Sequence, residues 1–231
     1  MRYGEIIELG RHKLMCGDAT SRDDVMRLVD GVKVDLVLTD PPYGIKVIGK
    51  DSTGSIGKYG REYKSVIGDN NSEMAREHYR IARTVSNRQI IWDGQNFTDF
   101  LPPSCGWLFW DKDKGTDKLS FSDGELAWAN ILTRIKKYKY KWNGNNIAGS
   151  PELNKRIHPT QKPVELHMRI LEDFSKPGDI ILDCFGGSGT TLIACEMTGR
   201  KCLMMEISPE YCDVIRERYE KLTEGKLPLE D

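Results

Sequence analysis

The chain has 231 residues, a formal net charge of −1 at pH 7, and 39% hydrophobic and 30% charged residues. This length suits one α/β domain, and no apolar run reaches the roughly 18 residues that a membrane span needs. The N-terminal residues are too polar for a secretory signal. A net charge near zero does not mark a nucleic-acid-binding protein, although the average hides any local basic face.

Six cysteines occur, at positions 16, 105, 184, 195, 202 and 212, and no two form a Cys-x-x-Cys pair. This usage predicts reduced, buried or half-buried thiols in a cytoplasmic protein, rather than disulfides. The histidines lack the close acidic or cysteine companions of a metal site, so we predict no metal.

Expected strands and helices alternate along the chain. Seven strands are expected, at His12–Cys16, Val34–Thr39, Arg88–Trp92, Gly106–Trp110, Glu125–Ile135, Asp179–Cys184 and Lys201–Glu206. Five helices are expected, at Ser21–Val29, Ser72–Val85, Pro163–Phe174, Thr190–Met197 and Pro209–Leu222. The alternation favours an α/β fold with a mostly parallel sheet and helices on both of its faces.

Acidic side chains stand at the carboxyl ends of the expected strands. They are Asp18, Asp40, Asp93, Asp183 and Glu206. Ligands of parallel sheets bind at the carboxyl ends of the strands. The topology alone therefore predicts a site where these acids gather.

The strand Val34–Thr39 runs directly into Asp40-Pro41-Pro42-Tyr43. Two consecutive prolines stop a helix and hold the preceding residue extended, so this turn is stiff. It presents a carboxylate, a carbonyl and an aromatic ring, a set that suits holding a planar base by its amino group and stacking on its face. The alternative is structural: Asp40 caps the turn and Tyr43 packs.

A glycine-rich turn, Phe185-Gly186-Gly187-Ser188-Gly189, follows the strand Asp179–Cys184. Backbone without side chains lets a ligand approach closely. The dinucleotide fingerprint needs a further glycine where this chain has Leu192, and the Gly-Lys-Ser/Thr of a P-loop is absent. The turn therefore suits a nucleoside without phosphates, and the Glu206 carboxylate suits the hydroxyls of a ribose.

Residues 44–68 are rich in Gly, Ser and Lys and lack periodicity, so we predict a mobile loop that acts as a lid, the alternative being a disordered connection. The one strongly basic stretch is Arg134–Trp142, where Lys137, Lys139 and Lys141 alternate with aromatic residues. An extended strand places these lysines on one face, which suits contacts with nucleic-acid phosphates. The alternative is an edge strand whose lysines discourage aggregation.

Together these segments resemble the amino-group DNA methyltransferases, the N6-adenine/N4-cytosine family that uses S-adenosylmethionine. The base-holding motif matches Asp40–Tyr43, and the cofactor loop matches Phe185–Gly189. The segment His158-Pro159-Thr160-Gln161-Lys162-Pro163 is similar to one that precedes the cofactor loop in this family, and Gly17-Asp18 is similar to its adenine-binding acid. A base motif before the cofactor loop is the circularly permuted order of the β class.

The resemblance implies a Rossmann-like methyltransferase fold, circularly permuted, with a mostly parallel seven-stranded sheet in a single domain over residues 1–231. Residues 111–157 take the position of a small target-recognition region. The implied partner is double-stranded DNA. Members of this class often dimerise, so a homodimer is a further expectation, in a bacterial or phage-encoded protein.

The resemblance also assigns roles to residues. The implied catalytic residues are Asp40, Pro41, Pro42 and Tyr43. The implied cofactor-binding residues are Asp18, Thr160, Lys162, Asp183, Phe185, Gly186, Gly187, Gly189, Thr190 and Glu206. Asp18 is alternatively a turn cap, and Thr160 and Lys162 alternatively begin the helix that follows. Contacts with DNA fall to Lys137, Lys139 and Lys141.

The implied reaction moves a methyl group from S-adenosylmethionine to the N6 amine of an adenine flipped out of the duplex. The Asp40 carboxylate and the Pro41 carbonyl accept the two N–H bonds of the amine, and Tyr43 stacks on the base. Aspartate at position 40 favours adenine, since the N4-cytosine enzymes more often carry serine there. The alternatives are an N4-cytosine enzyme, a methyltransferase of RNA or protein amines or amides, and a non-catalytic DNA-binding relic.

Overall fold

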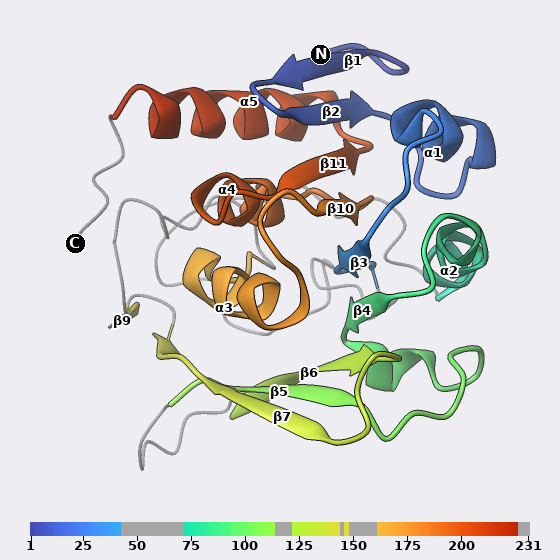
Figure 1. Cartoon of the computed structure of the whole chain (residues 1–231), viewed down its shortest axis with the longest axis vertical. Helices are drawn as coiled ribbons and strands as arrows, with labels where there is room; N and C mark the ends of the chain where they lie inside the picture. Colours follow the sequence, from blue (N-terminus) through green and yellow to red (C-terminus); the bar gives the residue numbers. More distant parts are fainter. Residues whose placement is uncertain (43–71, 114–121, 144–145, 148–160, 226–231) are drawn as a thin grey trace, which may run out of the picture.

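The structure of the chain is a computed structural model that describes residues 1–42, 72–113, 122–143, 146–147 and 161–225. Within these residues, nine strands form one mixed sheet in the order β1-β2-β11-β10-β3-β4-β6-β5-β7 (Figure 1). The strands are β1 (Ile6–Leu9), β2 (His12–Cys16), β3 (Leu36–Thr39), β4 (Gln89–Trp92), β5 (Trp107–Asp111), β6 (Gly124–Ala129), β7 (Ile135–Lys139), β10 (Ile180–Asp183) and β11 (Lys201–Glu206). A separate antiparallel pair joins β8 (Trp142–Asn143) to β9 (Asn146–Ile147).

The centre of the sheet is parallel. Strands β2, β11, β10, β3 and β4 pair in parallel as neighbours, so their carboxyl ends lie at one edge of the sheet. Beyond β4 the sheet is mixed, because β6 is antiparallel to both β4 and β5 while β7 is parallel to β5. Strand β1 pairs antiparallel with β2 at the other edge. The mostly parallel sheet expected from the sequence is confirmed.

Helices cover both faces of this sheet (Figure 1). The helical segments are α1 (Arg22–Val29), α2 (Glu73–Val85), α3 (Val164–Phe174), α4 (Thr190–Met197), α5 (Pro209–Thr223) and the 3₁₀ turn η1 (Gly94–Phe97). Along β3, Leu36 and Leu38 belong to a hydrophobic cluster with residues of α3, α4 and α5. Val37, which points to the opposite face, clusters with residues of α1 and α2. The five expected α-helices are thus confirmed, with two covering one face and three the other.

Local chemistry sets where several helices begin. The hydroxyl of Ser208 accepts the N–H of Tyr211, and Pro209 takes the first position of α5, as expected from the sequence. Ser21 caps α1 in the same way. Gly189 precedes α4 with a φ of 83°, a conformation that favours glycine, so the glycine-rich turn delivers the chain directly into the helix.

Two parts of the sheet differ from the sequence-based expectation of seven strands. Strand β1 has no counterpart in that expectation, and the expected strand Glu125–Ile135 is wrong because β6 ends at Ala129 and, after a turn, a separate strand β7 begins at Ile135. Asn130 ends β6: its Oδ1 accepts the N–H of Gln89 and its side-chain amide donates to the carbonyl of Asn87. The chain then crosses to the far side of β5, where β7 forms the edge of the sheet.

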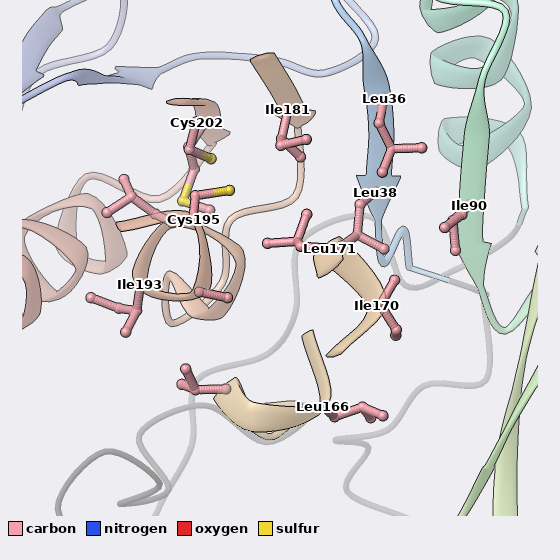
Figure 2. Packing of buried hydrophobic residues seen from close by; sticks show 14 of the residues in the cluster. Leu36, Leu38, Ile90, Leu166, Ile170, Leu171, Ile181, Ile193, Cys195 and Cys202 are labelled. Carbon is pink, nitrogen blue, oxygen red and sulfur yellow. The ribbon is translucent and has the colours of Figure 1, made fainter. Parts of the chain in front are cut away.

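The hydrophobic core directly supports the turn that carries Asp40. Figure 2 shows Leu38 of β3 among side chains that include Ile170 and Leu171 of α3, and Leu38 is fully buried. We expect Leu38→Ala to lower the free energy of unfolding by about 2–5 kcal/mol, because a cavity replaces packed atoms. Urea denaturation measures this, with the more exposed Val32→Ala as the control. Equal losses for the two variants would contradict this account of the core.

No helix among the residues that the structure describes is both long and apolar enough to cross a membrane. All six cysteines are free thiols. Five are buried as expected, but Cys105 is exposed, so the expectation of burial is wrong there. Cys105 lies in the connection that leads to β5, outside the two-sided core of the sheet.

Candidate active site

The carboxyl edge of the parallel strands gathers the five acids predicted from the topology. Asp18 follows β2, Asp40 follows β3, Asp93 follows β4, and Asp183 and Glu206 end β10 and β11. Because these strands are parallel neighbours, the five side chains lie along one edge of the sheet. Their contacts define two groups. Asp40 and Asp93 surround Lys162, and Asp183 and Glu206 contact the glycine-rich turn.

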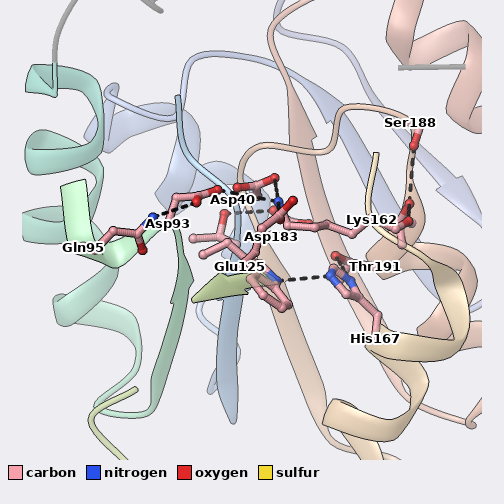
Figure 3. Close-up of polar contacts among 12 residues, drawn as sticks. Asp40, Asp93, Gln95, Glu125, Lys162, His167, Asp183, Ser188 and Thr191 are labelled. Carbon is pink, nitrogen blue, oxygen red and sulfur yellow. Dashed lines mark hydrogen bonds and ion pairs between the residues drawn. The ribbon is translucent and has the colours of Figure 1, made fainter. Parts of the chain in front are cut away.

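Lys162 forms the centre of the first group (Figure 3). Its side chain is 6% exposed, and its Nζ lies 2.8 Å from Oδ2 of Asp40, to which it donates a hydrogen bond. The same Nζ lies 3.1 Å from Oε2 of Glu125 and 3.7 Å from Oδ2 of Asp93. It also lies 5.2 Å from the centre of the Trp92 ring. One buried cation thus faces three carboxylates from three different parts of the sheet.

The carboxylates around Lys162 have further partners. Lys112, just after β5, places its Nζ 2.5 Å from Oε1 of Glu125. Gln95 of η1 donates to Oδ1 of Asp93. The chain of contacts therefore runs from Asp40 through Lys162 and Glu125 to Lys112. With Asp93, the group contains three acids and two lysines, which leaves one excess negative charge when all five groups are ionised.

These surroundings displace the pKa values of the group. Burial and the nearby Asp93 and Glu125 raise the pKa of Asp40 to about 7, against the opposing pull of Lys162. Burial alone would raise the pKa of Glu125, but Lys162 and Lys112 lower it to about 2. The three acids hold the pKa of Lys162 above its usual value in spite of burial. Asp40 is thus the member of the group whose charge changes most readily near neutral pH.

The second oxygen of Asp40 is set apart from this network. Oδ1 is buried and has no hydrogen-bond partner among the residues that the structure describes. Buried polar atoms are normally paired, so an unpaired acceptor at a strand end indicates a place for a donor from a ligand. Pro41 is buried and Pro42 half-buried, as suits a stiff turn. Tyr43, like the predicted lid at 44–68, lies outside the described residues.

The glycine-rich turn forms the second group. Gly186 lies against β11, where an added Cβ would meet Cγ of Met204 at 3.0 Å and the carbonyl of Met205 at 3.1 Å. Gly189 faces Ile215 of α5, which such a Cβ would meet at 3.1 Å. Phe185 and Gly187 are the residues of the turn that keep partial exposure. The turn therefore packs through Gly186 and Gly189 and presents Phe185 and Gly187 to a ligand.

Glu206 fixes the tip of this turn. Its Oε2 accepts the N–H of Gly187 at 2.8 Å, and its Oε1 accepts the N–H of Ser208 at 2.9 Å. Each carboxylate oxygen has a second lone pair, so these bonds leave acceptor sites for ligand hydroxyls. Burial raises the pKa of Glu206 above its ordinary value. The partly exposed glycine backbone at Gly187, next to an acceptor carboxylate, fits the nucleoside predicted from the sequence.

Three other predicted cofactor residues have structural partners. Asp183 is buried, and its Oδ1 accepts the hydroxyl of Thr39 and the N–H of Phe185, which ties β3 to the glycine-rich turn. Oδ1 of Asp18 accepts the N–H and the hydroxyl of Thr20 in a local turn. The hydroxyl of Thr190 donates to the carbonyl of Lys162. These contacts place Asp183 and Thr190 beside the glycine-rich turn, whereas those of Asp18 are local. Contact of all three residues with a cofactor stays a prediction.

Comparison with known proteins decides the family. The model of the N6_N4_Mtase family, described as DNA methylase, matches residues 65–217. The type II methyltransferase M2.DpnII of Streptococcus pneumoniae is 37% identical over 227 residues, covering 81% of this chain and 82% of its own length. The chain belongs to the DNA methylase family. The methylase is also 28% identical to the DNA adenine methyltransferase YhdJ of Escherichia coli K12, over 84% of this chain and 78% of YhdJ.

Solved structures share the fold of the methylase. M1.HpyAVI in complex with SAM aligns with a TM-score of 0.57 and 23% identity, over 89% of this chain and 97% of that one. The PvuII DNA methyltransferase, described as cytosine-N4-specific, aligns with a TM-score of 0.59 and 15% identity, over 92% and 90%. These likenesses confirm the Rossmann-like methyltransferase fold. They do not distinguish adenine from cytosine as the target.

The basic stretch of the methylase forms the edge strand β7 and the residues after it. Lys137 and Lys139 are mostly exposed, while Tyr138 and Tyr140 are buried, so the expected separation of lysines and rings is confirmed. Lys137 pairs with Asp111 at 2.7 Å and Lys139 pairs with Asp113 at 3.0 Å. In both pairs the lysine is more than half exposed, so the pairs are weak, and Lys141 is exposed as well. A contact with DNA through these lysines stays a prediction.

Residues 111–157, predicted to recognise the target, are described in part. Strands β6 and β7 lie within this range and belong to the main sheet, and β8 and β9 form the short pair that follows. Residues 114–121, 144–145 and 148–157 of this range, and Thr160 of the predicted cofactor site, lie outside the described residues. The recognition role of the range stays a prediction.

Sequence reasoning missed two parts of the site. Glu125 was hidden inside a strand pattern, although an acid among apolar residues of a strand is a signal of a buried polar contact. The second part lies under Lys162, where Trp92 donates its indole N–H to Nε2 of His167, and Thr191 contacts Nδ1 of the same ring. Burial lowers the pKa of His167 to about 3, which keeps the ring neutral.

Proposed function

We propose that this methylase transfers a methyl group to the N6 amine of an adenine flipped out of double-stranded DNA at a specific sequence. The observation that carries the proposal is the Asp40 carboxylate, whose Oδ2 is held by Lys162 while its buried Oδ1 is unpaired among the described residues. An ionised oxygen fixed in this way is a hydrogen-bond acceptor for an amine. Its position at the end of β3 is where ligands of parallel sheets bind.

The methyl donor is S-adenosylmethionine, which supplies a methyl group on a positively charged sulfur. Glu206 and the tip of the glycine-rich turn would hold its ribose, since Glu206 keeps acceptor sites beside the exposed backbone of Gly187. The excess negative charge of the group around Lys162 suits a nearby positive charge. The residues of both groups therefore fit this cofactor.

The chain itself orients the target amine. The exocyclic amine of a base is a poor nucleophile because its lone pair is delocalised into the ring. Oδ1 of Asp40 and the carbonyl of Pro41 accept its two N–H bonds, which favours a nitrogen whose lone pair is free to react. Extrusion of the base from the duplex brings the amine to this strand end, and exclusion of water there strengthens both hydrogen bonds.

Adenine is preferred to cytosine because position 40 is an acid. The YhdJ relative, described as a DNA adenine methyltransferase, supports this choice. A host that lacks its own DNA methylation can express the methylase, and sequencing of its DNA with detection of modified bases then tests the proposal. We expect N6-methyladenine at one short sequence. N4-methylcytosine, or unmodified DNA from cells with abundant folded protein, would contradict it.

A further inference from the structure

Lys162 is better placed to act on Asp40 than on the cofactor. Its Nζ is directed away from the glycine-rich turn and into the three carboxylates, as Figure 3 shows. Only its backbone carbonyl faces that turn, through the hydroxyl of Thr190. The resemblance implied a cofactor contact for Lys162, but the observed partners of its side chain belong to the base-binding end of the site.

The position of Lys162 is itself fixed from several sides. Glu125 receives Lys162 at one oxygen and Lys112 at the other. Trp92 lies under the ammonium group, and Asp93 lies at 3.7 Å. Lys162 therefore does not form a single ion pair. It is enclosed by Asp40, Asp93, Glu125 and Trp92, which together we call the cage. The cage leaves Lys162 little freedom and directs its Nζ to Oδ2 of Asp40.

We propose that Lys162 is a positioning residue that keeps Asp40 ionised and turns its Oδ1 toward the substrate amine. Glu125 holds Lys162 in place, and its negative charge partly offsets the effect of Lys162 on the ionisation of Asp40. The inference rests on the proposed function, because it assigns a task in the same site. A protonated Asp40 would donate through one oxygen and lose the charge that attracts the amine hydrogens. Methyl transfer therefore requires the ionised form.

The charges that face Asp40 have opposite effects on its ionisation. Lys162, preceding α3, favours the ionised form, while Glu125 of β6 and Asp93 after β4 oppose it. Lys112 acts through Glu125, and Asp183 of β10 contacts the neighbouring Thr39. Since an opposite charge at this distance typically lowers the pKa of a carboxyl by about 1–3, removal of Lys162 should raise the midpoint of Asp40 ionisation by a similar amount. Removal of the Glu125 charge should lower it.

The test combines two readouts on the full chain. Carboxyl ¹³C NMR of aspartate-labelled protein, with Asp40→Asn to assign the signal, follows the ionisation of Asp40 directly. The second readout is the pH dependence of the rate of single-turnover methyl transfer to DNA. In the wild type this rate should rise with pH as Asp40 loses its proton, with the same midpoint as the NMR titration. The variants are Lys162→Met, Lys162→Arg and Glu125→Gln, with Lys13→Met as a control from a lysine paired with an exposed aspartate.

We expect the midpoint to rise in Lys162→Met, fall in Glu125→Gln, and stay near the wild-type value in Lys162→Arg and Lys13→Met. Affinity for S-adenosylhomocysteine should change less than about threefold in every variant, well below the tenfold that 1.4 kcal/mol produces. Glu125→Gln preserves the shape of the side chain and removes only its charge, so it tests the proposal even if Lys162→Met does not fold.

Opposite shifts in the two variants support the proposal. An unmoved midpoint in both, or a tenfold loss of S-adenosylhomocysteine affinity in Lys162→Met without a shift, would overturn it. The NMR readout needs neither DNA nor cofactor. A wild-type chain that transfers no methyl group to DNA would therefore refute the proposed function, while the titration would still decide what Lys162 does.

Discussion

Replacement of Asp40 by alanine should lower the rate of methyl transfer to DNA by about 10²–10³-fold and leave the fold and the cofactor affinity intact. The variant loses the acceptor for the target amine, and removal of one preorganised polar partner of a reacting group costs about 10²–10³-fold in rate. The fold should survive because Lys162 keeps Glu125 and Asp93 as partners, so no buried cation is left unpaired. Single-turnover transfer from labelled S-adenosylmethionine measures the rate.

Asp30→Asn serves as the control for this variant, since the Asp30 side chain is exposed at the end of α1 and, among the described residues, forms an ion pair with Lys13 alone. Its rate should equal that of the wild type. Calorimetric binding of S-adenosylhomocysteine should be unchanged in both variants. An Asp40→Ala protein that methylates DNA at a rate near that of the wild type would remove Asp40 from the mechanism, whatever its neighbours do.

The second large effect is expected at Glu206. Glu206→Ala removes the acceptor beside the glycine-rich turn and also the anchor of the Gly187 N–H. Hydrogen bonds to charged groups contribute about 1.5–3 kcal/mol each, so the Kd for S-adenosylhomocysteine should rise roughly 10- to 100-fold. Glu206→Gln keeps the size and one acceptor oxygen, so its loss should be smaller. Isothermal titration calorimetry measures both.

The exposed Glu220 of α5 offers a matched control, and Glu220→Ala should bind like the wild type. The prediction separates the two halves of the site. Glu206 variants should lose affinity for the cofactor but retain transfer at saturating cofactor, whereas Asp40 variants should show the reverse. Unchanged affinity in Glu206→Ala would mean that the nucleoside binds elsewhere on the sheet edge.

The fold was largely predictable because its signals are local. Ser208 and Pro209 mark the start of α5 through backbone chemistry that acts within one helical turn. The acids at the ends of β2, β3, β4, β10 and β11 were expected to gather, since parallel neighbours share one edge. The turn at Asn130 escaped prediction because its two bonds reach Asn87 and Gln89, more than forty residues earlier in the chain.

The site was predictable only in part. Asp40 and the glycine-rich turn carry their own signatures, a Pro-Pro stop and a run of glycines. The cage around Lys162 has none, because Glu125 lies on β6 and meets Lys162 only after the sheet has formed. Long-range pairs of this kind depend on strand order, and that order changed when the expected strand Glu125–Ile135 proved to be two strands. Local sequence patterns therefore could not identify the residues that hold Asp40.

The most direct test of the central claim is nucleoside mass spectrometry after the purified methylase has acted on mixed-sequence duplex DNA with methyl-labelled S-adenosylmethionine. The account predicts label in N6-methyladenine, and about 10²–10³-fold slower labelling when Asp40 is replaced by alanine. Label in N4-methylcytosine would contradict the assignment of Asp40 to an adenine amine. Label in added RNA or protein, with none in DNA, would contradict the proposed substrate altogether.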